Sequence, residues 1–157
     1  MEQFIDENGK QVEISFEKGR FQQESYHVLV LCRYKGEWLL TRHKKRGLEF
    51  PGGKREKGET LEEAAVRETY EETGGVIKEP FCIGEYKVYD HSPFIKTIFF
   101  AKAEEIINKE DYLETEGAVL WSGDFSSIHD DPSFSFIMKD QVVDLALKRI
   151  KDLNLMI

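Results

Sequence analysis

The chain has 157 residues, of which 40% are hydrophobic and 33% charged, enough for one domain with its own core. The net charge of −8 excludes a protein that tracks long duplex nucleic acid, because backbone binding needs many Lys and Arg contacts. No apolar run approaches the roughly 20 residues of a membrane span, and the polar N-terminus does not resemble a signal peptide. We therefore expect one cytoplasmic domain over residues 1–157 with no membrane partner. Nothing in the sequence indicates an oligomeric state.

The first half of the chain is rich in strand patterns. Residues 11–16 alternate between polar and apolar, as in a half-buried strand. The apolar run 26–33 is followed by a turn at 34–37 and a return over 38–42, which predicts a hairpin. Residues 48–50 are a short extended piece leading into Pro51-Gly52-Gly53.

A helix with well-marked ends follows. Thr60 and Glu63 form the capping-box pattern that begins many helices. Residues 61–73 contain no Gly or Pro, and Gly74-Gly75 supplies a stop. The spacing predicts a helix over 61–73.

The second half predicts strands near 83–89, 95–102 and 118–121, with a polar stretch at 104–117, and an amphipathic helix over 136–153. The predicted strands and helices do not follow the repeated strand–helix–strand order of βαβ units. This pattern favours an α/β fold in which helices sandwich a mixed sheet.

Two cysteines and four histidines are scattered along the chain. Cys32 and Cys82 can pair in principle, but two small buried thiols in a reducing compartment fit the apolar surroundings better. The histidines form no ligand set, and no Cys/His cluster indicates zinc.

Three carboxylates gather on one face of the predicted helix. At about 100° per residue, Glu68, Glu71 and Glu72 lie within an arc of about 100°. Such crowding is costly without a counter-charge, and a hard divalent cation resolves it. The alternative is a solvent-exposed helix with ion pairs such as Glu63–Arg67. The preceding glycines favour the cation, because they let a backbone carbonyl approach it.

The segment from Gly53 to Gly74 resembles the Nudix hydrolases. Their pattern G-x5-E-x7-R-E-U-x-E-E-x-G-U, with U apolar, is met at every fixed position, namely Gly53, Glu59, Arg67, Glu68, Glu71, Glu72 and Gly74. Thr69 and Gly75 depart from it at the two apolar positions. The segments LLTRHKKRGLEFPGGK, GEYKVY, DYLETEG and FSFIMKD are similar to the YtkD subfamily of MutT-type Nudix proteins.

The resemblance implies the Nudix alpha-beta-alpha sandwich and a set of residue roles. Glu68, Glu71 and Glu72, with the carbonyl of Gly52, would hold Mg²⁺, or Mn²⁺ in its place. Glu68 would activate the attacking water, although Nudix enzymes differ in which carboxylate is the base. Arg67 would orient a box carboxylate, and Glu59 would brace the loop against the helix.

Further candidates lie outside the box. Glu114, or else Glu116, could complete the metal site, and a surface acidic loop is the alternative. Cationic residues form a basic lip that suits a polyanion, or else a solvated loop: Arg42, Lys44, Lys45, Arg46, Lys54, Arg55 and Lys57. Arg42 and Lys54 are the substrate-binding candidates within it. Tyr86, Phe134, Phe136 and Lys139 are candidates for a base pocket, with core packing as the alternative for each aromatic ring.

The subfamily is associated with hydrolysis of nucleoside triphosphates, including 8-oxo-dGTP, and with removal of pyrophosphate from triphosphorylated RNA 5′ ends. We therefore expect a metal-dependent pyrophosphohydrolase acting on one of these substrates. The distinguishing motifs of the coenzyme A, ADP-ribose and NADH pyrophosphatases do not match, although another nucleoside diphosphate derivative remains an alternative. A non-catalytic nucleotide-binding Nudix module is the other, but degenerate modules usually lose a box glutamate and this chain keeps all of them.

Overall fold

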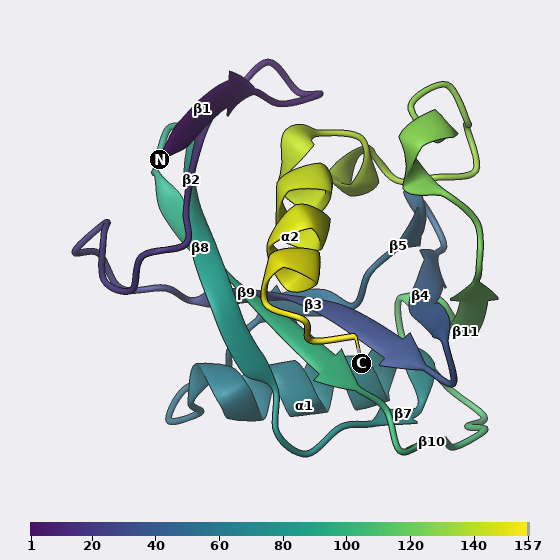
Figure 1. Cartoon of the computed structure of the whole chain (residues 1–157). Coiled ribbons are helices and arrows are strands. Elements are labelled where there is room, and N and C mark those ends of the chain that lie inside the picture. The colour runs from purple at the N-terminus through teal and green to yellow at the C-terminus, as the bar shows by residue number, and fades with distance from the viewer. Residues whose placement is uncertain (157) are drawn as a thin grey trace.

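The computed structural model describes residues 1–156. Two helices, α1 (Leu61–Thr73) and α2 (Gln141–Asp152), cover opposite faces of a twisted sheet (Figure 1). The strand order is β1-β2-β8-β9-β3-β4-β11, with β3 and β9 parallel and the other neighbours antiparallel. The expected sandwich with a mixed sheet is confirmed.

The strands of this sheet are β1 (Glu2–Ile5), β2 (Gln11–Ser15), β3 (His27–Tyr34), β4 (Glu37–His43), β5 (Gly47–Glu49), β6 (Gly52–Lys54), β8 (Phe81–Tyr89), β9 (Phe94–Lys102) and β11 (Thr115–Trp121). A separate pair joins β7 (Gly75–Val76) to β10 (Glu105–Ile106). Strand β1 was not expected, because its sequence has only one buried apolar side chain, that of Phe4.

Strand β3 organises the centre of the sheet because it has different partners along its length. Its end pairs with β4, in the predicted hairpin. The turn residues Lys35 and Gly36 both have positive φ, 48° and 82°, as a two-residue type I′ turn requires. Its beginning pairs with β6, which carries the glycines that follow Pro51. The same strand therefore fixes both the hairpin and the glycine-rich loop.

Helix α1 begins and ends as predicted. Thr60 Oγ1 accepts the Glu63 amide at 3.0 Å, and the Glu63 carboxylate accepts the Thr60 amide at 2.9 Å. At the other end Gly74 adopts φ 77°, and a Cβ there would lie 2.0 Å from the Ile107 carbonyl oxygen. Only glycine fits this position, so the helix must end here.

The C-terminal helix is shorter than predicted. A 3₁₀ turn, η2 (Phe136–Met138), precedes α2 and is capped by Ser135. Asp140 then caps α2, its Oδ1 accepting the Val142 amide at 2.9 Å. Two capping residues five positions apart divide the segment into two elements, which the apolar periodicity alone did not show.

Each face of the sheet has its own core. The smaller one packs Ala64 and Ala65 of α1 against Val28, Val30 and Phe99. The larger one lies under α2 and includes Leu29, Leu31, Ile98 and Phe100 along with the aromatic side chains near β11. Alternate residues of β3 and β9 therefore face α1 and α2, which decides the side on which each polar residue of these strands lies.

Both cysteines are free thiols, as expected, but Cys82 is exposed rather than buried. Within residues 1–156 no helix is long and apolar enough to cross a membrane.

Candidate active site

The glycine-rich strand β6 lies directly against α1. A Cβ on Gly53 would lie 1.9 Å from Oε2 of Glu68, and a Cβ on Gly52 would lie 2.3 Å from the carbonyl oxygen of Val28. The Gly52 amide donates to Oε1 of Glu72 at 2.8 Å. The two glycines thus allow the backbone to approach both the carboxylates and β3, which a side chain would prevent.

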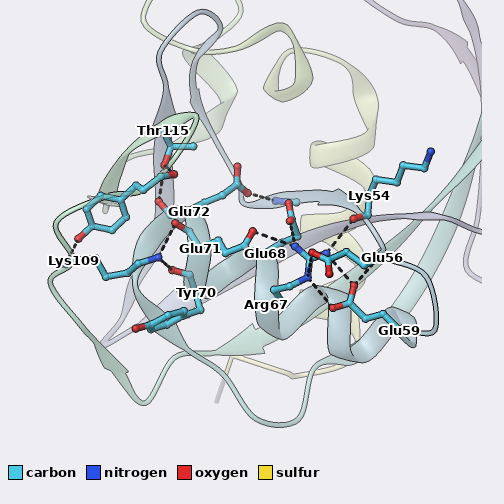
Figure 2. Close-up of polar contacts among 12 residues, drawn as sticks. Lys54, Glu56, Glu59, Arg67, Glu68, Tyr70, Glu71, Glu72, Lys109 and Thr115 are labelled. Carbon is cyan, nitrogen blue, oxygen red and sulfur yellow. Dashed lines mark hydrogen bonds and ion pairs between the residues drawn. The ribbon is translucent and has the colours of Figure 1, made fainter.

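Arg67 lies at the centre of the carboxylate cluster and binds three of its glutamates (Figure 2). Its guanidinium donates two hydrogen bonds to Glu59, of 2.7 and 2.9 Å, one to Glu71 of 3.1 Å and a short one to Glu68. It also donates to the carbonyl oxygen of Lys54 at 3.1 Å. One side chain therefore ties the loop before α1 to the helix and orients two of its glutamates.

The C-terminal end of α1 has no basic residue of its own. Its carbonyls are satisfied from other elements, because Thr41 Oγ1 and Thr115 Oγ1 each donate to the Glu72 carbonyl at 2.9 Å. Lys109 Nζ donates to the carbonyls of Tyr70 and Glu71, both at 3.1 Å (Figure 2). These contacts fix the helical turn that carries Glu71 and Glu72, and Lys109 places a positive charge at the negative end of the helix dipole.

Two of the helix carboxylates are partly desolvated. Burial raises the pKa of Glu68 to about 7, against the effect of Arg67, while Glu71 adds to the rise. Burial also raises the pKa of Glu72 to about 8, although the Gly52 amide opposes this and Glu68 and Glu49 add to it. The site therefore favours the neutral form of these two carboxyl groups unless a cation compensates their charge.

This chemistry fits a hard divalent cation. The available donors are carboxylate and carbonyl oxygens, the ligands that Mg²⁺ and Mn²⁺ prefer. Glu68 and Glu71 are aimed at Arg67, and Glu72 at the Gly52 amide, so no three acidic side chains of residues 1–156 converge on one point. The donor set suits the ion, and side-chain rotation would have to complete the arrangement.

Glu114 and Glu116 both lie exposed at the start of β11. The carboxylate of Glu114 is 3.8 Å from Nε2 of His43, whose Nδ1 accepts the amides of Lys45 and Arg46. Glu114 thus lies beside the loop that follows β4, where the hydrogen bond to Glu49 raises the pKa of Arg46 and the charges of Glu72 and Glu114 raise it further.

The basic lip is less cationic than its sequence indicates. Arg46 is paired with Glu49, and Arg55 with Glu24. Arg42 and Lys54 are exposed, and no ion pair occupies either side chain within residues 1–156. Arg42 and Lys54, like Lys45 and Lys57, therefore remain available to a polyanion, and Lys54 directly follows the glycines.

The candidate base-pocket residues separate into two groups. Tyr86 and Phe136 line one cavity of about 200 Å³ between β8, β9 and the turn before α2. Phe134 is packed in the core, 5.1 Å from Trp121 between ring centroids, so for this residue the core-packing alternative is correct. Lys139 lies at the end of η2 and does not line the cavity.

Two polar residues beside this cavity were not predicted. Lys96 lines it, and His27 is its neighbour on β3. Lys96 shares a face with Ile98 and Phe100, so the alternation in β9 places a lysine where an apolar residue is expected. That break in the alternation was the signal available in the sequence.

The family model of the NUDIX domain matches residues 22–122, which include β3 to β11 and the whole carboxylate cluster. The chain belongs to the Nudix family. Nudix hydrolases in general require a divalent metal ion, and the expected enzyme class is confirmed with the family.

Among related Nudix proteins, YtkD of Bacillus subtilis (strain 168), named as a candidate 8-oxo-dGTP diphosphatase, is 44% identical over 97% of both chains. A crystal structure of the Bacillus subtilis pyrophosphohydrolase BsRppH, in a glutamate-to-alanine variant, is 42% identical and superposes with a TM-score of 0.93 over 97% of both chains. A NUDIX hydrolase from Nitrosomonas europaea, 18% identical, shares the fold with a TM-score of 0.62 over 83% of this chain and 89% of its own.

The two departures from the Nudix pattern have different structural settings. A Cβ on Gly75 would lie 2.7 Å from Leu39, so the close packing of the helix exit on β4 favours glycine. Thr69 is fully buried, and its hydroxyl has no hydrogen-bond partner within residues 1–156. The threonine therefore places an unsatisfied polar atom where the family has an apolar side chain.

Proposed function

We propose that this Nudix enzyme is a Mg²⁺-dependent pyrophosphohydrolase that cleaves the polyphosphate of a nucleoside triphosphate, including 8-oxo-dGTP, or of an RNA 5′-triphosphate end. The observation that carries the proposal is the complete carboxylate cluster on α1, held against Gly52 and Gly53, in a chain with the relatives described above. Mn²⁺ is the alternative ion.

In this proposal Glu68, Glu71 and Glu72 hold the metal with the Gly52 carbonyl, and Glu114 joins them if its loop moves toward α1. A bound metal would neutralise charge on the polyphosphate and make an attacking water more acidic.

The protein's own groups do the remaining work. Glu68 accepts the proton of the attacking water, from a position set by Arg67 and by the contact with Gly53. Arg67 keeps Glu68 and Glu71 pointing to one side of α1, and Glu59 fixes the guanidinium from the loop. This division gives Arg67 a positioning role.

Substrate contacts are assigned from exposure and position. Arg42 and Lys54 attract the polyphosphate, and Lys54 lies next to the glycines that approach Glu68. Tyr86 and Phe136 line the cavity proposed for the base, where aromatic rings can stack on it. Lys139 lies at the edge of this region and is proposed to contact the base only if the 3₁₀ turn moves. The free thiols Cys32 and Cys82 also suit a reducing, cytoplasmic setting.

The test compares substrates under one condition. Purified protein with Mg²⁺ is given dGTP, 8-oxo-dGTP and a short 5′-triphosphate RNA, and the products are separated and identified. We expect release of pyrophosphate or phosphate from at least one substrate, with a nucleoside monophosphate or a 5′-monophosphate RNA as the other product. Nucleotide binding without turnover of any of them would instead support a non-catalytic module.

A further inference from the structure

A row of polar side chains crosses the sheet from the catalytic loop to the base cavity. In register, Lys54 of β6 faces His27 of β3, His27 faces Lys96 of β9, and Lys96 faces Tyr86 of β8. Directly paired residues lie on the same face of a sheet, so these side chains share the α2 face. Neighbouring strands are about 4.8 Å apart, so the row spans about 14 Å.

One end of the row lies at the catalytic loop, where the polyphosphate is proposed to bind, and the other end lies at the cavity proposed for the base. At one end, the Lys54 carbonyl accepts Arg67 and the preceding Gly53 contacts Glu68. Strand β6 pairs only with β3 in the described part of the chain, so no further strand separates the glycines from the row at this edge of the sheet. At the other end, Lys96 and Tyr86 line the cavity of about 200 Å³.

The middle of the row lacks partners. Within residues 1–156, Lys96 has no ion pair or hydrogen bond, and its ammonium lies over the ring of Tyr86 at 5.9 Å. Nδ1 of His27 is buried without a hydrogen bond, and its ring packs on Phe94 at 5.1 Å. Polar groups in such surroundings are costly unless a ligand satisfies them.

The charged groups that shift the pKa of His27 are its neighbours in the strand register. Burial lowers the pKa of His27, and the charges of Lys96 and Lys54 lower it further, as expected for neighbours in one row. Burial also lowers the pKa of Lys96, against the opposing effects of Glu49, Asp140 and Asp6, and both aspartates line the same cavity. None of these three carboxylates forms an ion pair with Lys96 within residues 1–156, so an anion bound to Lys96 would compete with them for its charge.

We propose that His27 and Lys96 bind the phosphate that joins the polyphosphate to the nucleoside, and thereby position the substrate between the catalytic loop and the base cavity. The inference rests on the proposed function for the direction of the substrate. It adds a positioning role for two residues outside the Nudix box.

The test measures binding rather than turnover. Affinities for guanosine and for GMP, which differ by this one phosphate, are determined by calorimetry for the wild type and for K96Q, K96R and H27Q. Lys10→Gln is the matched control, because Lys10 lines the same cavity but is paired with Asp90 at 3.3 Å and lies outside the row.

We expect the wild type to bind GMP about tenfold or more tightly than guanosine, as for hydrogen bonds to a charged group. Lys96→Gln should bring the two affinities within about twofold, with guanosine binding unchanged. His27→Gln should reduce the difference partly, and Lys96→Arg and Lys10→Gln should keep it.

An unchanged preference for GMP in Lys96→Gln would overturn the inference, as would a wild type that binds both ligands equally or binds neither. Failure of the proposed function has a different signature, because it would show as absent hydrolysis by a wild type that still prefers GMP.

Discussion

Arg67 holds Glu59 through two hydrogen bonds, of 2.7 and 2.9 Å, across the loop that precedes α1. The pair joins the loop to the helix, and it lowers the pKa of Glu59, chiefly through the hydrogen bonds from Arg67. Of the other N–H groups of Arg67, two point to Glu68 and Glu71 and one to the Lys54 carbonyl. The loop and the carboxylate arrangement are therefore coupled through one guanidinium.

Glu59→Gln tests this coupling. The amide keeps one acceptor and loses the charge, so we expect the free energy of unfolding to fall by about 1–2 kcal/mol. Activity should fall about tenfold or more, because the released guanidinium shifts toward the α1 glutamates. Urea unfolding and steady-state turnover measure the two effects.

Glu62→Gln, an exposed substitution in the first turn of α1, is the control and should change stability and activity little. Equal effects of the two substitutions would contradict the coupling.

Gly53→Ala should cost more activity than stability. The new methyl would lie 1.9 Å from Glu68 Oε2, the mobile end of a side chain, and the φ of 158° at this position adds some backbone strain, so we expect a displaced carboxylate together with a modest loss of stability. We expect turnover to fall about 100-fold, in the range seen when a positioned catalytic group is lost. Gly58→Ala is the matched control. Its φ is 81° with open space around the Cβ, so it should lose about 1 kcal/mol of stability and keep its activity. A fully active Gly53→Ala would show that Glu68 does not need its present position.

Thr69→Val should stabilise the protein. The hydroxyl is buried without a partner in the described chain, and valine has nearly the same shape, so removing it should raise the free energy of unfolding by about 1 kcal/mol. Thr73→Val, one turn later, should have the opposite sign. The Thr73 hydroxyl donates to the Thr69 carbonyl at 2.6 Å and accepts the Gly75 amide at 2.9 Å. Thermal or urea unfolding of both variants decides the matter, and a destabilised Thr69→Val would indicate that the hydroxyl is satisfied.

Sequence patterns predicted the fold where local chemistry decides it. Thr60, Glu63 and Gly74 set the ends of α1 through bonds within a few residues, and all three act as predicted. The division of 136–153 into η2 and α2 was missed, because Ser135 and Asp140 act as caps in competition with an apolar pattern that is continuous across them.

The candidate site divides in the same way. Glu68, Glu71 and Glu72 follow from helix geometry, and the structure places them against the glycine loop. The surroundings of Glu114 and the burial of Phe134 depend on contacts between distant segments, which one sequence does not reveal. In the sequence Lys96 appeared only as a break in strand alternation. Its place beside His27 and Tyr86 became apparent only from the register of β3, β8 and β9.

Asp140 should make stability depend on pH. Burial raises the pKa of its carboxyl to about 7, against the Val142 amide. The folded state then binds the proton more tightly than the unfolded state, so this group's contribution is fully present below pH 4 and is lost as pH rises to about 7. Asp140→Asn keeps the cap and should flatten that decline, with a gain at pH 8 of about 2–4 kcal/mol relative to pH 4.

Asp124→Asn is the control, because the contribution of Asp124 to stability should depend on pH in the opposite direction. Hydrogen bonds from Ser126 lower the pKa of the exposed Asp124 carboxyl, so its charge favours the folded state at neutral pH and not in acid. Urea unfolding at pH 4, 6 and 8 compares the two variants. A parallel pH profile for Asp140→Asn and the wild type would contradict the assigned burial.

The most direct test of metal-dependent catalysis at the α1 carboxylates is hydrolysis of dGTP, 8-oxo-dGTP and a 5′-triphosphate RNA with and without Mg²⁺, by the wild type, Glu68→Gln and Glu62→Gln. We expect that the wild type and Glu62→Gln release pyrophosphate or phosphate only with the metal, and that Glu68→Gln is at least about 100-fold slower on the same substrate. Hydrolysis by Glu68→Gln at the rate of the wild type, or hydrolysis that persists after chelation of the metal, would contradict this expectation.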